Sequence, residues 1–107
     1  MKILWLCNSK FSSDKIKTTG SWLQPLCEQL SQIEGNELYN ISEYSGSTII
    51  REKFNNIQQW CVPKDKHAKN NHQIASDSFC RDVANIIDGV KPDIVHIWGT
   101  ETIFPSI

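Results

Sequence analysis

Two short apolar runs, near the beginning and near the end of the sequence, constrain the fold most strongly. Residues 3–6 read Ile-Leu-Trp-Leu, and residues 93–98 read Asp-Ile-Val-His-Ile-Trp. In both runs apolar residues occupy consecutive positions instead of alternating with polar ones, which is typical of strands buried on both faces of a parallel sheet. Each run is therefore predicted to be a strand with side chains packed above and below it.

Apolar residues three and four positions apart predict an amphipathic helix over residues 22–33. Two starting points are open for this helix. Ser21 and Gln24 can form a capping box, or the helix can begin at Pro25, where the missing N–H does no harm. Gly35 is expected to end the helix.

The same spacing predicts a second helix over residues 74–90. Near its end, Gly89 is followed by Val90 and Pro92. Glycine supplies the left-handed conformation that closes many helices, and proline cannot continue a helix. The second helix is therefore expected to end in a Schellman-type motif.

Two further strands are predicted in the middle of the chain. Residues 36–41 alternate polar with apolar side chains, and residues 57–62 form a strand-like run ended by Pro63. Residues 42–56 are polar and expected to be irregular. The order strand, helix, strand, strand, helix, strand predicts an α/β fold, a Rossmann-like three-layer domain with a mostly parallel sheet. Right-handed crossovers favour the strand order 3-2-1-4, counted along the chain.

The composition fits one globular domain and excludes several kinds of partner. The 107 residues are 39% hydrophobic, and 12 acidic against 11 basic side chains give a net charge of −1, so no binding to nucleic acid is expected. The four cysteines form no C-x-x-C pair, which favours reduced thiols and a cytoplasmic location. The N-terminal apolar run is too short for a signal peptide or a membrane span.

The loops that follow the first and the fourth strands are the expected functional region. Open α/β sheets bind ligands beyond the carboxyl ends of their strands, where the strand order reverses. These loops are residues 7–21 and 99–104. Gly20 and Ser21 lead into the first helix, where they either bind phosphate through backbone N–H groups or only cap the helix.

Three more candidates lie around the end of the fourth strand. His96 is either a buried, hydrogen-bonded structural residue or faces a ligand near the end of the strand. Thr100 and Glu101 follow directly. They either border a ligand or cap a helix, with the Glu101 carboxylate favoured by the helix dipole.

No cofactor or metal site is expected. The dinucleotide pattern G-x-G-x-x-G and the phosphate-loop pattern G-x-x-x-x-G-K-[ST] are both absent. The basic stretch 64–69 is interpreted as a solvated loop, and Cys7 has no histidine near it in sequence to make it a nucleophile. Four side chains have spacings that match no usual zinc site: Cys61, His67, His72 and Cys80.

Three segments, taken in order, carry a family resemblance. They are Met-Lys-Ile-Leu-Trp at residues 1–5, Thr-Gly-Ser-Trp-Leu at residues 19–23, and Lys-Pro-Asp-Ile-Val-His-Ile-Trp-Gly-Thr-Glu at residues 91–101. The chain thereby resembles the N-terminal domain of the family 4 (group 1) retaining glycosyltransferases of GT-B fold. The resemblance runs over essentially the whole chain, and the third segment is its most telling part.

The resemblance implies roles for the five candidate residues. Gly20 and Ser21 would approach the phosphates and the sugar of the donor from the N-terminal side. Thr100 and Glu101 would border the acceptor, and His96, in the same segment, is a further substrate-binding candidate. The resemblance also implies that the catalytic residues lie beyond Ile107, the last residue of this sequence.

The resemblance further implies that residues 1–107 are a single, incomplete N-terminal domain without the donor-binding domain. The complete enzyme would move a sugar from a nucleotide-sugar donor to a glycan or lipid-linked acceptor with retention, and it would associate with a membrane surface. The fragment alone is expected to be inactive. Its fourth strand would form an apolar sheet edge, which favours a homodimer. The alternative is a non-catalytic α/β binding module, alone or completed by a partner chain.

Overall fold

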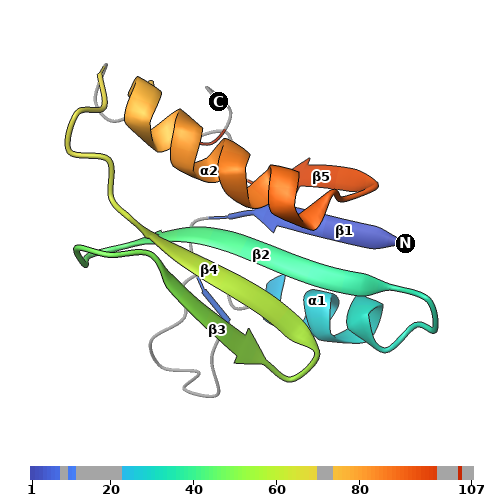
Figure 1. Ribbon diagram of the computed structural model, residues 1–107. Coiled ribbons are helices and arrows are strands. Elements are labelled where there is room, and N and C mark those ends of the chain that lie inside the picture. Colours follow the sequence, from blue (N-terminus) through green and yellow to red (C-terminus); the bar gives the residue numbers. More distant parts are fainter. Residues whose placement is uncertain (8–9, 12–22, 70–73, 99–103, 105–107) are drawn as a thin grey trace.

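A mostly parallel β-sheet lies between two helices in the computed structural model (Figure 1), which describes residues 1–7, 10–11, 23–69, 74–98 and 104. The elements along the chain are β1 (Lys2–Leu6), α1 (Leu23–Ser31), β2 (Glu37–Tyr44), β3 (Ile50–Phe54), β4 (Ile57–Pro63), α2 (Asp77–Val90) and β5 (Ile94–Ile97). The predicted α/β class and the mostly parallel sheet are confirmed.

The sheet has five strands in the order β3-β4-β2-β1-β5. β1 is parallel to both β2 and β5, and β2 is parallel to β4, whereas β3 is antiparallel to β4. The strand order differs from the predicted one by a single strand: the four predicted strands keep the order 3-2-1-4, as β4-β2-β1-β5, and β3 adds a fifth strand beside β4, where an irregular segment was expected. Asn55, with a φ of 52°, turns the chain tightly from β3 into β4.

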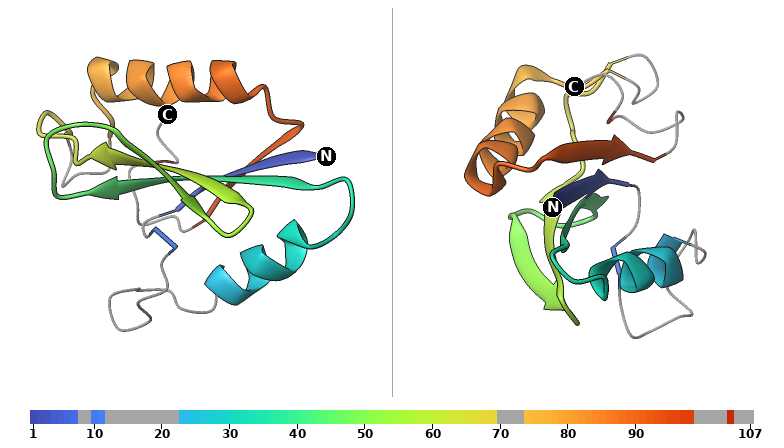
Figure 2. Two further views of the ribbon diagram at one scale, coloured as in Figure 1. Left: turned by 60° about the horizontal axis from the view of Figure 1, so that its bottom comes forward. Right: turned by 90° about the vertical axis from the view of Figure 1, so that its right-hand side faces the viewer.

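The two helices cover opposite faces of the sheet (Figure 2). Leu4 and Leu6 of β1 enter the core on the α2 side, while Trp5 and Cys7 enter the core on the α1 side. Successive side chains of a strand point to opposite faces, so both faces of β1 are buried. This confirms the interpretation of the first apolar run.

The helix ends differ from the expectations in detail. Ser76 caps α2 by accepting a hydrogen bond from the Phe79 N–H. At the other end the left-handed residue is Lys91, with a φ of 53°, and Gly89 lies inside the helix. α1 ends at Ser31 rather than at Gly35.

The start of α1 tests one of the two starting points that the sequence left open for this helix. Pro25 is the third described residue of α1, so a helix that begins at Pro25 is wrong. Ser21, the capping residue of the other alternative, lies outside the described residues. The described part of the helix buries Leu23 and Cys27 against the sheet.

β5 departs most clearly from its predicted environment. All four of its residues are exposed, and Ile94, Val95 and Ile97 keep 46%, 42% and 41% of their surface accessible. Among the described residues β5 pairs with β1 alone, and it forms one edge of the sheet. The predicted apolar sheet edge is therefore confirmed, whereas the packing above and below that the apolar pattern suggested for this second run is wrong for the described residues.

This edge predicts self-association of the chain. Exposed apolar edge strands offer unpaired N–H and C=O groups to another strand, and neither charge nor proline protects this one. We expect light scattering at tens of micromolar to show dimers that Ile97→Lys converts to monomers. Ile33→Lys, which changes an isoleucine 55% exposed beyond α1, should leave the dimer intact. A monomeric parent chain would contradict the prediction.

Candidate functional site

The carboxyl ends of four parallel strands meet at one edge of the sheet. In sequence, β1 leads to residues 7–21 and β5 leads to residues 99–104, the two loops in which the ligand site was expected. Gly20 and Ser21 in the first loop, and Thr100 and Glu101 in the second, lie outside the described residues. Of the five sequence-predicted site residues, His96 is the one that the structure describes.

The expected position of the catalytic residues lies outside the description as well. The family resemblance places these residues beyond Ile107, and Ile107 itself is outside the described residues. The described part of the chain therefore does not test where the catalytic groups lie, and their place after Ile107 stays a prediction.

His96 belongs to an aromatic cluster on the α1 face of the sheet. Its ring is stacked on Trp98, with 4.1 Å between centroids, and meets Trp5 edge-on at 6.1 Å. Trp98 and Phe11 also contact Trp5 edge-on, at 5.0 and 6.1 Å. Edge-on and offset contacts of this kind stabilise aromatic pairs, so these rings hold the end of β5 against β1.

The interpretation of His96 as a buried structural residue is wrong. The residue is exposed, and it stands on β5, the strand at the edge of the sheet. Its imidazole therefore meets solvent while its ring is held in one orientation by Trp98. An oriented, solvent-facing imidazole can donate or accept a hydrogen bond with a ligand.

A buried polar network fixes the beginning of the first loop. The Gln59 side chain accepts from the Phe11 N–H at 2.7 Å and donates to the Phe11 carbonyl at 2.8 Å. Asn40 donates to the same Gln59 oxygen at 3.3 Å and accepts from the Cys7 thiol at 3.0 Å. Gln59, Asn40 and Cys7 are all fully buried.

This network does for Phe11 what a neighbouring strand would do. The amide of Gln59 satisfies both backbone groups of Phe11, and Phe11 can then bury its ring against Trp5. Sequence reasoning missed Asn40 and Gln59. The available signal was a polar residue at an inward position of each strand, two residues after Leu38 and Ile57 respectively.

The network yields a stability prediction. Gln59→Leu keeps a side chain of similar size but leaves the Phe11 N–H and C=O buried without partners, so the free energy of unfolding should fall by about 2–4 kcal/mol. Urea denaturation followed by circular dichroism measures this loss. Gln29→Leu, on the exposed side of α1, should change stability by less than about 0.5 kcal/mol. Equal effects of the two substitutions would show that the network does not stabilise the loop.

The buried thiols are poor nucleophiles. Burial raises the pKa of Cys27 to about 12, and the neighbouring Cys7 and Glu28 contribute to this rise. Burial also raises the pKa of Cys61, and Glu52 adds to this. A thiol must ionise to attack an electrophile, so these side chains serve packing. All four cysteines are described, and none forms a disulfide.

The basic stretch after β4 surrounds a buried carboxylate. Asp65 accepts hydrogen bonds from the His67 N–H and from the N–H and hydroxyl of Ser76, at 2.7–3.0 Å. Asp65 and Ser76 thereby occupy the N-terminus of α2. Lys64 and Lys66 are exposed and line a cavity of about 270 Å³ with His67.

Within the described ranges no cluster of three metal-ligating side chains occurs.

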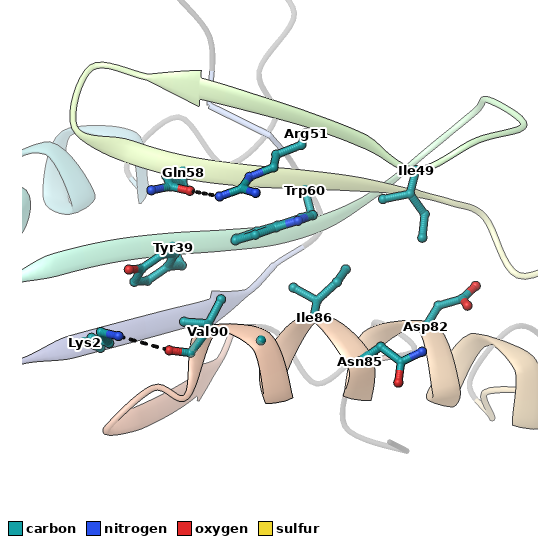
Figure 3. Close-up of a pocket in the computed structure, with 11 residues that line it drawn as sticks. Lys2, Tyr39, Ile49, Arg51, Gln58, Trp60, Asp82, Asn85, Ile86 and Val90 are labelled. Atoms are coloured by element: carbon teal, nitrogen blue, oxygen red, sulfur yellow. Dashed lines mark hydrogen bonds between the residues drawn. The ribbon is translucent and has the colours of Figure 1, made fainter.

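A larger groove runs between α2 and the sheet (Figure 3), on the face opposite His96. Its volume is about 460 Å³, within the usual range of small-molecule sites. The wall on the sheet side consists of Tyr39, Ile49, Arg51, Gln58 and Trp60. The wall on the helix side consists of Asp82, Asn85, Ile86, Gly89 and Val90. Lys2 closes one end of the groove. None of these residues was a sequence-predicted candidate.

Comparisons with known proteins add no assignment. No family model, no curated protein sequence and no solved structure matches this chain. In the part of the chain that the structure describes, neither helix has the length and apolar character needed to cross a membrane.

Proposed function

We propose that residues 1–107 form the acceptor-side, Rossmann-like domain of a retaining glycosyltransferase of GT-B fold that uses a nucleotide-sugar donor. The observation that carries the proposal is the pairing of β1 with β5. Two of the three segments that resemble the family, residues 1–5 and 91–101, include residues of these two strands, and the strands are parallel neighbours with their carboxyl ends at the same edge.

The connections of β1 and β5 support a ligand crevice at this edge. β1 is followed by α1 on one face of the sheet, and β5 is preceded by α2 on the other face. In open α/β sheets, ligands bind outside the carboxyl ends of the strands at the point where the strand order reverses, and here this point lies between β1, which is followed by β2 on one side, and β5 on the other side. His96 lies on β5 at the rim of this expected crevice.

Each candidate residue has a role in the proposal. Gly20 and Ser21 approach the donor phosphates, with glycine allowing the backbone to come close. Thr100 and Glu101 border the acceptor, a glycan or a lipid-linked sugar, and the His96 imidazole hydrogen-bonds one of its hydroxyls. The donor-binding domain and the catalytic groups belong to the part of the protein that follows residue 107, and the reaction needs no cofactor.

The proposal is tested in the complete protein with His96→Ala. Loss of an acceptor contact should lower kcat/KM for the acceptor by at least about tenfold, or ~1.4 kcal/mol of transition-state binding. Lys53→Ala, on the exposed edge strand β3, serves as the control and should keep the parental value. Transfer that is unaffected by His96→Ala would remove His96 from the acceptor site.

The isolated chain gives a second test. Because the donor-binding domain is a separate domain in this proposal, calorimetric titration of residues 1–107 with nucleotide sugars should show no binding tighter than millimolar. A micromolar dissociation constant would contradict the assignment of this domain to the acceptor side.

A non-catalytic α/β binding module is the second candidate. The groove on the α2 face favours it, because this groove lies away from the carboxyl edge and does not depend on a second domain. The reading frame after codon 107 distinguishes the two. Roughly 250 further residues that carry a second α/β domain would support the transferase, and a stop codon would support the module.

A further inference from the structure

The groove on the α2 face exists because one helix covers that face incompletely. Five strands about 4.8 Å apart make a sheet roughly 19 Å wide, whereas a helix is about 10 Å across. The connection from β2 to β4 runs through β3 and contains no helix. α2 therefore leaves the sheet surface over β3 and β4 uncovered. The groove lies in this uncovered area, next to the helix.

An aromatic platform forms the sheet wall of the groove. The rings of Tyr39 and Trp60 are stacked, with 6.0 Å between centroids and 28° between planes. Both side chains are half-buried and stand on the adjacent strands β2 and β4. In Figure 3 they lie opposite Ile86 and Val90 of α2. Paired strands hold the rings in place, so the platform is formed before any ligand arrives.

The cations of the groove already have partners. The Arg51 guanidinium lies 5.1 Å from the centre of the Trp60 ring and donates to Gln58. The Lys2 ammonium donates to the Val90 carbonyl at 3.3 Å. Asp82 adds a negative charge on the helix wall. A strongly anionic ligand would meet this carboxylate and compete with those contacts, so the groove favours a neutral ligand.

The remaining polar groups suit hydroxyl groups. Asn85 and Asp82 are exposed on the helix wall, and Gln58 stands on the sheet wall. Amides offer a donor and an acceptor in one plane, and a carboxylate accepts two hydrogen bonds. A rim of such groups around an apolar aromatic surface matches a ligand that has an apolar face and hydroxyls along its edge.

We propose that this groove binds a neutral pyranose unit of a glycan. The C–H face of the sugar ring packs against the apolar surface that Trp60 and Tyr39 present to the groove, beside the Arg51 guanidinium that already lies over the Trp60 ring. The sugar hydroxyls hydrogen-bond to Asn85, Asp82 and Gln58. The inference does not rest on the proposed transferase function, because the groove lies on the opposite face from His96.

Gly89 provides a matched pair of variants that does not disturb the platform. A Cβ added at Gly89 would meet no atom within 4 Å, and the residue lies in α2 with its surface toward the groove. Gly89→Ala leaves most of the groove open, whereas Gly89→Phe fills it. Both replacements suit a helix better than glycine, so both proteins should fold.

The experiment is a nuclear magnetic resonance titration of residues 1–107 with methyl α- and β-glycosides of glucose, mannose and galactose. We expect saturable shifts of the Trp60 indole N–H and the Asn85 amide with at least one glycoside, at a millimolar dissociation constant (about −4 kcal/mol). Gly89→Ala should retain the binding. Gly89→Phe and Trp60→Ala should weaken it at least tenfold.

Several outcomes would overturn the proposal. Trp60 signals that do not respond to any glycoside would exclude a sugar site, as would shifts confined to His96 and Trp98. Unchanged binding by Gly89→Phe would place the sugar outside the groove. Adenosine monophosphate serves as the anionic competitor, and tighter binding of this nucleotide than of every glycoside would make the groove a nucleotide site instead.

Discussion

The mismatch between the width of the sheet and the cover that its helices supply determines most of the surface of this domain. In the part of the chain that the structure describes, each face has one helix for five strands. A helix spans about two strands, so the outer strands on each face need another source of cover. On the α1 face that source is partly the segment around Phe11. On the α2 face the area beside the helix stays open as the groove, and β5 stays exposed at the sheet edge.

The Phe11 segment shows what it takes to cover a sheet without regular structure. An irregular backbone brings N–H and C=O groups that a buried position cannot leave unpaired. Here the Gln59 amide from β4 satisfies both groups of Phe11, and Asn40 from β2 completes the arrangement. The stability of the α1 face and the position of Phe11 therefore depend on the same few hydrogen bonds.

Sequence patterns predicted a strand or a helix correctly where the segment's own residues determine which faces of it are buried. The consecutive apolar residues of β1 and the helical period of α2 predicted both elements. β3 was missed because Arg51 and Lys53 make it polar, and it is a strand only through its antiparallel pairing with β4. The left-handed residue at the end of α2 was placed at Gly89, whereas Lys91 adopts it because the Lys91 N–H bonds back to the Ile87 carbonyl.

The candidate sites were predictable to a smaller degree, because they depend on which strands are neighbours. The sequence was enough to single out His96 as a candidate residue. Its exposure to solvent follows instead from the position of β5 at the edge of the sheet. Tyr39 and Trp60 are twenty-one positions apart, and the register that sets Ile41 opposite Trp60 is what brings the two rings together. Strand register is set by the whole sheet and leaves little trace in either segment alone.

The two proposed sites also differ in how far each depends on what pairs with the edge strand β5. Hydrogen bonds along β5 can be completed by a second copy of the chain or by further strands of a longer protein, and either would extend the sheet beside the carboxyl end of β5. The surroundings of His96 therefore depend on what covers this edge. The groove is lined by residues of β2, β3 and β4, with Lys2 of β1 at one end, and none of its lining residues belongs to β5. Its walls are complete within this chain, so its ligand can be identified without first knowing what β5 pairs with.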